Sequence, residues 1–290
     1  MKLKATLENY ALVAPAVLIF SIFYIIPFFS VLQLGFYDWD GILPTKIFVG
    51  WSNFKEIFSD RIWWQSLWQS GYITIIALTF QNILAFLLAW ACDREIRMKN
   101  FYRLIFFIPP VLSEVVVGLV WQWILNGNYG ILNSWLVHFG HPDLVRNWLS
   151  DPNTALTTVA IVHCWKGFGW GFLLFLAGLQ TIPRELYEAA RVDGANAWES
   201  FKNVTAPLMI PVVVMVGILT ILGTMQVFVL IYTMTGGGPG YHTEVPVLRI
   251  LASMRGSSRF GYACAQGITF GVILCAISFV QYLVSKKARN

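Results

Sequence analysis

Six apolar runs constrain the fold of this chain more than any other feature of its sequence. Each is long enough to cross a bilayer as an α-helix, which takes about 20 residues. Hydrophobic residues make up 57% of the chain and charged residues only 12%, a balance that does not suit a water-soluble domain. We expect one all-α membrane domain over residues 1–290, with six transmembrane helices near 10–34, 71–92, 104–125, 155–179, 208–234 and 262–284.

Lysine and arginine are distributed unevenly among the segments between these runs. The N-tail, the second and fourth loops and the C-tail hold 12 of the 20 basic residues, whereas the longer alternate loops hold 7. Positive charge is in excess on the cytoplasmic side of membrane proteins. We therefore expect both termini and loop 181–207 to be cytoplasmic. The first run is too long for a secretion signal and lacks a convincing cleavage site, so we expect a retained helix.

Residue types that usually carry chemistry form no recognisable cluster. The four cysteines lie in or beside apolar runs, which predicts small hydrophobic packing groups and neither a disulfide framework nor a metal site. No HExxH, GxSxG or P-loop motif is present, so we expect no enzyme activity and no nucleotide bound by this chain. The basic residues flank the apolar runs and form no single stripe, which argues against a nucleic-acid partner.

One polar segment, ELYEAARVDGANAWESFKNVTAPLMIP at 185–211, interrupts the apolar pattern. Pro183 suits a first helical turn, and acidic residues follow it where a helix dipole favours them. Asp193 and Gly194 then form a turn signal before a second helical stretch. The pattern predicts a helix, hinge, helix unit whose small residues allow close approach by another protein. A plain amphipathic interfacial helix is the alternative.

The order of motifs resembles the permease subunits of binding-protein-dependent ABC importers. EAARVDGA at 188–195 and APLMIP at 206–211 are similar to their cytoplasmic signature loop, and FVGWSNF at 48–54 resembles a conserved external motif. The run RLIFFIPPVLSEVVVGLVWQW at 103–123 resembles the family's third span. TGGGPGYHT at 235–243, with Gly237, Gly238 and Pro239, is similar to the external loop of the first of two paired sugar permeases in the maltose-type class.

This resemblance implies a type I importer core of six helices in the cytoplasmic membrane of a prokaryote. It implies four kinds of partner: a second homologous permease, two ATPase subunits that bind ATP and magnesium, an external substrate-binding protein, and a sugar-like substrate. The signature helix would dock in a cleft of the ATPase. The residues that the resemblance assigns to that coupling are Glu185, Glu188, Ala189, Ala190, Asp193, Gly194 and Ala195.

Two departures from the family pattern affect the identity of the sugar and leave the class intact. Val229 follows Phe228 in the fifth span, where many members have an aspartate. RILASMRGSSRF at 249–260 replaces the usual aromatic pair after the Gly-Gly-Pro loop.

Ionisable side chains near the middle of two spans suggest a substrate pathway, because such positions are energetically costly. These are Glu114 and Lys166, with Trp121 seven positions after the acid and Trp170 four positions after the amine. Indole rings beside charged groups suit a hydroxyl-rich ligand. Thr224 and Gln226 are further polar candidates. An ion pair that only locks two helices, and hydrogen bonds between helices, are the alternative interpretations.

A self-sufficient secondary carrier for a small polar solute is the second functional hypothesis. Such carriers are built from internal repeats with broken-helix ion sites. The signature loop fits this hypothesis poorly, and ATP dependence of uptake separates the two.

Overall fold

The computed structural model describes residues 12–93 and 98–289 of the chain. Four basic residues of the charge argument therefore lie outside the described residues: Lys2, Lys4, Arg94 and Arg97. The chain forms two compact units, one of Met1–Arg61 with Arg249–Ile273 and the other of Ile62–Leu248 with Leu274–Asn290.

Among the described residues, five helices are long and apolar enough to cross a membrane. A sixth candidate is a pair of helices bent by 94°. The five are Leu12–Leu34, Arg61–Asp93, Ala155–Gln180, Ala197–Met225 and Phe260–Leu283.

The smaller unit begins with the first span, of which α2 (Ile26–Leu34) is the last part. A short antiparallel pair follows, β1 (Tyr37–Asp38) with β2 (Ile47–Phe48), and then the amphipathic helix α3 (Ser52–Ser59). The FVGWSNF motif at 48–54 runs from the end of β2 into the first turn of α3. Asn53 is buried, and its side-chain amide donates to the carbonyl oxygens of Gly35 and Tyr37 at 3.0 and 2.9 Å. Asn53 of this motif thus has a structural role.

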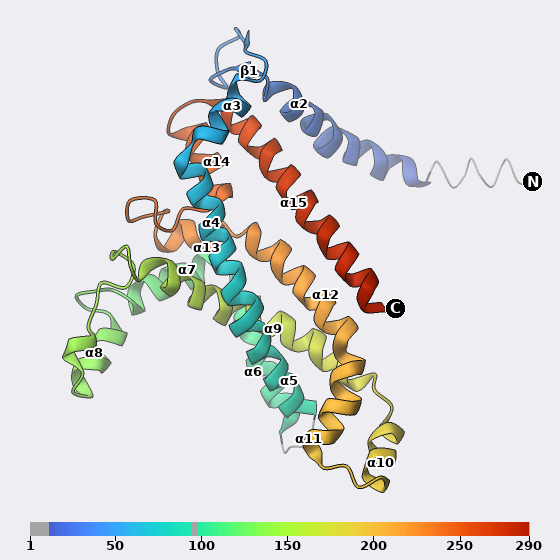
Figure 1. The fold of residues 1–290 in the computed structure, drawn as a ribbon. Coiled ribbons are helices and arrows are strands. Elements are labelled where there is room, and N and C mark those ends of the chain that lie inside the picture. Colours follow the sequence, from blue (N-terminus) through green and yellow to red (C-terminus); the bar gives the residue numbers. More distant parts are fainter. Residues whose placement is uncertain (1–11, 94–97, 290) are drawn as a thin grey trace, which may run out of the picture. The chain divides into compact units, whose positions relative to one another are not determined.

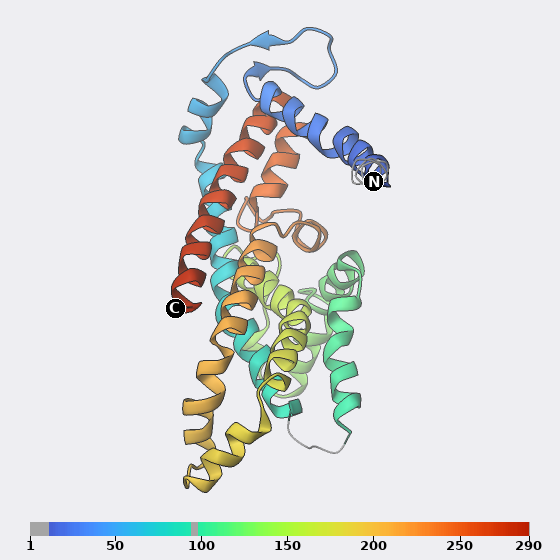
Figure 2. The ribbon, with the colours of Figure 1, turned by 90° about the vertical axis from the view of Figure 1, so that its right-hand side faces the viewer.

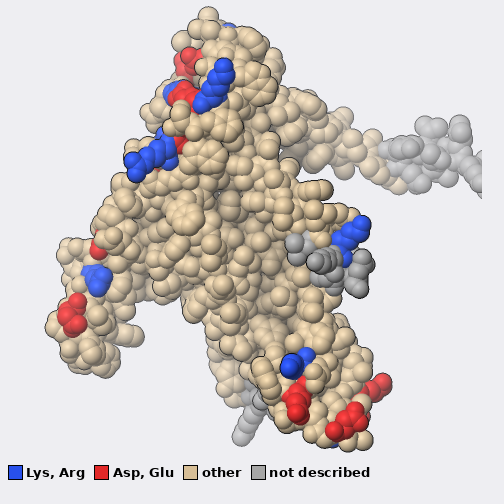
Figure 3. Space-filling model, in the orientation of Figure 1, with Lys and Arg blue, Asp and Glu red and all other residues tan. Residues whose placement is uncertain are grey.

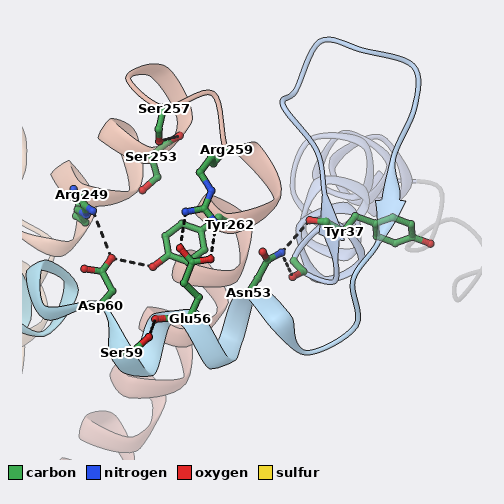
Figure 4. A network of polar contacts seen from close by, with 11 residues as sticks. Tyr37, Asn53, Glu56, Ser59, Asp60, Arg249, Ser253, Ser257, Arg259 and Tyr262 are labelled. Carbon is green, nitrogen blue, oxygen red and sulfur yellow. Dashed lines mark hydrogen bonds and ion pairs between the residues drawn. The ribbon is translucent and has the colours of Figure 1, made fainter.

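Charged side chains fasten α3 to the C-terminal part of the smaller unit (Figure 4), which holds most of α14 (Pro246–Arg255) and the start of α15 (Phe260–Arg289). The Arg259 guanidinium donates two hydrogen bonds of 2.6 Å to the Glu56 carboxylate. The hydroxyl of Tyr262 donates to Asp60 at 2.9 Å, and Arg249 lies 3.5 Å from the same carboxylate. The hydrogen bond from Arg259 holds the pKa of Glu56 below its ordinary value.

The larger unit is organised around α9 (Ala155–Gln180), which packs against α5 (Asn82–Asp93), α6 (Lys99–Val111) and α12 (Ala206–Met225), as Figures 1 and 2 show. Phenylalanines of α9 interlock with alanines of α5 in the buried core. Glycines let the helices approach closely. A Cβ on Gly178 would lie 2.8 Å from Val212, and one on Gly171 would lie 3.2 Å from Ala85. Small residues at helix contacts are typical of membrane proteins.

The expected third span at 104–125 is not one straight helix. It is divided into α6 and α7 (Glu114–Ile124), with Leu112 and Ser113 extended between them. Pro110 has no N–H to offer the carbonyl of Phe106, and a proline inside a helix bends or ends it. Gly169 of α9 lies directly against that carbonyl, so close that a side chain there would overlap it. Close packing of α9 against the end of α6 therefore depends on glycine at position 169.

The expected fifth span at 208–234 is also interrupted. The helix begins earlier, passes from α11 (Ala197–Ser200) through the π-helical turn η4 (Phe201–Thr205) into α12, and ends at Met225. A separate short helix, α13 (Val229–Met234), follows and packs on α7. Gly118 permits this contact, because a Cβ there would come within 2.8 Å of Thr233.

Candidate functional site

A cavity of about 370 Å³ lies within the larger unit, and we call it the central cavity. It is bordered by α9 and α12, by the first residue of α7, and by the end of the π-helical turn η2 (Ala77–Gln81), which follows α4 (Arg61–Ile76). Its polar lining residues are Gln81, Glu114, His163, Lys166, Thr220 and Thr224, and Trp170 adds an indole ring. Four of the six residues expected on the substrate pathway therefore meet in one cavity.

Glu114 and Lys166 form an ion pair in the wall of the central cavity. The Lys166 Nζ lies 3.9 Å from Glu114 Oε1, and their side chains are 14% and 41% exposed. A pair at this distance is a loose one, since a charge-assisted hydrogen bond of this kind spans about 2.7–2.9 Å. The ion pair and the pathway position, which the sequence offered as alternatives, thus occur together: the two residues pair, and both line the cavity.

His163 also lines the central cavity, in addition to the residues expected from the sequence. Its Nε2 lies 3.4 Å from the hydroxyl of Thr224. The signal was available, because residues three apart on a helix share a face and His163 precedes Lys166 by three positions. Gln81 is placed by a π-helical turn, a distortion often found at functional sites. Asn82, its neighbour, makes a helix-to-helix bond instead, accepting from the Thr220 hydroxyl at 3.1 Å.

Two expected pathway residues lie elsewhere. The Trp121 ring packs edge-on against Trp165 at a centroid distance of 5.4 Å and does not line the central cavity. Gln226 follows the last residue of α12, is exposed, and donates to the carbonyl of Leu222 at 3.1 Å. Helical spacing from Glu114 could not show that the bend between α6 and α7 would turn α7 away from its expected direction.

The signature segment forms α10 (Arg184–Val192) and the turn after it. Pro183 precedes the helix as its N-cap and is not part of the first turn. The Gly194 N–H bonds to the Arg191 carbonyl, and the Ala195 N–H bonds to the Ala190 carbonyl, at 3.1 and 2.9 Å. This is the Schellman pattern, with Gly194 at φ +81° in the left-handed position. The expected hinge is therefore a defined helix C-cap.

A second cap fixes the start of α11. The Asn196 side chain accepts from the backbone N–H groups of Trp198 and Glu199, and the Glu199 carboxylate accepts from the Asn196 N–H. This reciprocal pair is a capping box. The Tyr187 hydroxyl lies 2.9 Å from that of Thr205, which ties α10 to η4. The loop is therefore rigid in itself, although nothing on α10 is buried.

An open hollow of about 540 Å³ lies between α10 and the segment that follows it, and we call it the α10 hollow. Five residues expected to couple to an ATPase line it: Ala189, Ala190, Asp193, Gly194 and Ala195. Glu185 and Glu188 are exposed on α10 but do not line it. Figure 3 shows charged atoms at this end of the larger unit, next to a broad uncharged surface. The hollow thus combines small side chains with charged residues in and near its lining.

The Gly-Gly-Pro loop is the third place that the sequence singled out. Gly237 has a φ of +92°, and Gly238 and Pro239 line a second cavity of the larger unit. The Thr243 hydroxyl donates to the Gly238 carbonyl at 2.7 Å, and the Gln69 side chain donates to the Tyr241 carbonyl at 2.8 Å. The loop is thus a fixed turn, as its glycines predict.

Most of the chain matches one protein family. Residues 81–290 match the family model described as "Binding-protein-dependent transport system inner membrane component". The chain belongs to this family. It is therefore a multi-pass permease component of an ABC importer, as the motifs indicate.

Relatives and solved structures agree with this assignment. The chain is 34% identical over 283 residues to the probable ABC transporter permease protein YurN of Bacillus subtilis, covering 97% of each chain. It is 29% identical to the trehalose/maltose transport system permease protein MalF of Thermococcus litoralis, over all of this chain and 97% of that one. A chain of a bacterial alginate ABC transporter, solved in complex with an alginate pentasaccharide-bound periplasmic protein, has the same fold, with a TM-score of 0.84 at 22% identity and coverage of 99% and 96%.

Proposed function

We propose that this permease conducts a sugar or a related polyhydroxylated solute through its central cavity. The observation that carries the proposal is the convergence of one acid, one amine, one imidazole, two hydroxyls, one amide and an exposed indole on a single cavity. Such a cavity offers donors and acceptors for hydroxyl groups and a flat apolar face for a sugar ring. The relative from Thermococcus litoralis, named for trehalose and maltose transport, supports the same class.

Separate ATPase subunits, which bind ATP and magnesium, energise this transport by docking at the α10 hollow. The hollow suits that task because its lining includes three alanines and a glycine, whose small size lets another backbone approach closely. The capping box and the Schellman turn make the loop stiff enough to transmit a push. Glu188 supplies an exposed charge beside the contact.

The other partners are a second, homologous permease and an external substrate-binding protein. The family description names binding-protein dependence, and the alginate transporter was solved with such a protein. Both termini and the α10 hollow face the cytoplasm of the prokaryotic cell, and the Gly-Gly-Pro loop faces outward, according to the distribution of basic residues.

Transport proceeds by alternating access. Closure of the ATPase subunits moves α10 and, through the continuous helix Ala197–Met225, the wall of the central cavity that contains Thr220 and Thr224. The cavity then opens outward and receives substrate. A ligand can shift this equilibrium only as far as it binds the two states differently.

Proteoliposomes test the proposal. The complex that co-purifies with the tagged chain is reconstituted with its binding protein outside and with or without ATP and magnesium inside. Uptake of radiolabelled maltose or trehalose is expected only with internal ATP. Uptake that follows an ion gradient without ATP would instead establish the secondary carrier, which neither the family nor the relatives support.

A further inference from the structure

The larger unit contains a second polar cavity, at the opposite end of α7 from Glu114. It has a volume of about 520 Å³, and Gln122, Asn126, Asn147, Ser150, Tyr232 and Thr233 line it together with the Gly-Gly-Pro loop. We call it the amide cavity. Among the described residues that line it, none is charged. This absence of charge distinguishes it from the central cavity, where Glu114 and Lys166 meet.

Several polar groups of the amide cavity are available to a ligand. Within the described part of the chain, no hydrogen bond engages the side chains of Asn147, Ser150 or Tyr232. The Gln122 amide donates only a long bond of 3.5 Å to the Met234 carbonyl. Amides and hydroxyls both donate and accept, so they match sugar hydroxyls, which do the same. The described lining residues include no arginine or lysine, the side chains that form strong charge-assisted hydrogen bonds with an anionic ligand.

Tyr232 adds an aromatic ring to the lining of the amide cavity. The Tyr232 side chain is 53% exposed, and one face of its ring stacks on Phe228 at a centroid distance of 5.6 Å. Stacking holds the ring in one orientation. A fixed, half-exposed ring beside amide groups suits the apolar face of a pyranose.

The walls are held in place before any ligand arrives. The buried Asn133 donates to the carbonyls of Gly127 and Arg146 at 3.0 and 2.9 Å, and it accepts from the Trp148 indole at 2.8 Å. One side chain thus joins the two loops that border the cavity. Gly127 has no room for a Cβ, because the Asn147 side-chain oxygen lies against it. A preorganised site binds with less loss of conformational freedom.

We propose that the amide cavity is a binding site for a neutral sugar at the outer end of the transport pathway. It rests on the proposed function, and it narrows the substrate class to uncharged pyranosides. The sugar contacts Tyr232 with its ring face and Asn147, Ser150 and Gln122 with its hydroxyls. From there it passes along α7 to the central cavity.

Saturation-transfer NMR on the full chain in lipid nanodiscs tests this site. The probes are maltose and trehalose, with sn-glycerol 3-phosphate as the charged comparison. Both disaccharides are expected to bind the wild type, and the phosphate is expected to bind more weakly. Tyr232→Ala should weaken the affinity about tenfold and Asn147→Ala several-fold. Trp135→Ala, on an exposed aromatic outside the cavity, should bind like the wild type, and Tyr232→Phe, which keeps the ring, should lose less affinity than Tyr232→Ala.

Other results would overturn the inference. Binding that Lys166→Met abolishes and Tyr232→Ala leaves intact would place the probe in the central cavity. Failure of both disaccharides to bind, or equal binding of the phosphate, would remove the neutral-sugar site. If the disaccharides bind at Tyr232 while uptake needs no ATP, the proposed function fails and the site stands. If uptake needs ATP and Tyr232→Ala leaves affinity unchanged, the site alone fails.

Discussion

Lys166, in the middle of α9, and Glu114, the first residue of α7, form a loose ion pair of 3.9 Å in the wall of the central cavity. The lysine is the more buried partner, with 14% of its side chain exposed against 41% for the acid. The pair joins the bent third span to the central helix of the larger unit. A ligand that enters the cavity meets both charges.

Neutral replacement of the pair separates a pathway role from a structural one. Glu114→Gln leaves a largely buried lysine without its counter-charge, which is more destabilising than loss of the whole pair. We expect the double variant Glu114→Gln with Lys166→Met to restore normal assembly, measured by the yield of intact complex. If the residues line the pathway, its sugar uptake stays at least about tenfold below that of the wild type. Wild-type uptake by the double variant would make the pair purely structural.

The close contact between Gly169 and the Phe106 carbonyl can be tested by adding a methyl group to Gly169. A methyl group on Gly169 would overlap the Phe106 carbonyl and would lie 2.5 Å from the Pro110 ring, and neither can move freely. Gly169→Ala should therefore destabilise the protein by about 1–3 kcal/mol and lower its melting temperature in detergent. Gly71→Ala is the matched control, because a Cβ there meets nothing within 4 Å. Equal melting temperatures for both variants would argue against the close contact.

The C-cap of α10 depends on the backbone conformation of Gly194. A Cβ at this position faces open space, so any effect of substitution comes from its φ of +81°. Asparagine tolerates the left-handed region, whereas a β-branched residue does not. We expect Gly194→Val to raise amide exchange at Ala195 and to lower sugar-stimulated ATPase activity, and Gly194→Asn to retain both. Identical exchange in the two variants would contradict the Schellman cap.

The bond between Arg259 and Glu56 predicts an acid sensitivity of the smaller unit. Because this bond holds the pKa of Glu56 below its ordinary 4.5, the stabilisation is fully present above pH 4.5 and is lost as pH falls through the lowered value. The effect is modest, since both side chains are nearly half exposed. Protection factors of the α3 amides, which are corrected for the intrinsic pH dependence of amide exchange, should fall between about pH 7 and pH 3 in the wild type. Glu56→Gln should show a smaller fall, and an equal fall in both proteins would rule out this contribution.

Much of the architecture follows from the sequence, and the exceptions have physical causes. Hydropathy locates the apolar runs, but it does not indicate that the third run, with Pro109 and Pro110, is divided into two helices. The break after Met225 has no proline, only Gly223 two residues before it, and it accompanies the packing of α13 on α7 through Gly118. Such tertiary contacts are outside the reach of periodicity.

In the candidate sites, too, some features could be predicted from the sequence and others could not. Intramembrane charge alone was enough to find Glu114 and Lys166, because such residues are rare. Spacing was not enough for Trp121, whose ring turned out to pack on Trp165. The amide cavity could not be predicted, since the loops around Asn126 and Asn147 and the helix that carries Tyr232 meet only in the folded chain.

The most direct test of the account is whether an ATPase docks at the α10 hollow. Tagged wild type, Ala189→Trp and Val192→Trp are purified from detergent-solubilised membranes, and the ATPase activity of the co-purifying material is measured. Ala189 lines the hollow, whereas Val192 is 88% exposed on the same helix and does not. The account predicts that an ATPase and a second permease accompany the wild type and Val192→Trp, and that Ala189→Trp loses the ATPase alone. Equal ATPase recovery with both tryptophan variants, or a wild type that purifies alone and inert, would contradict it.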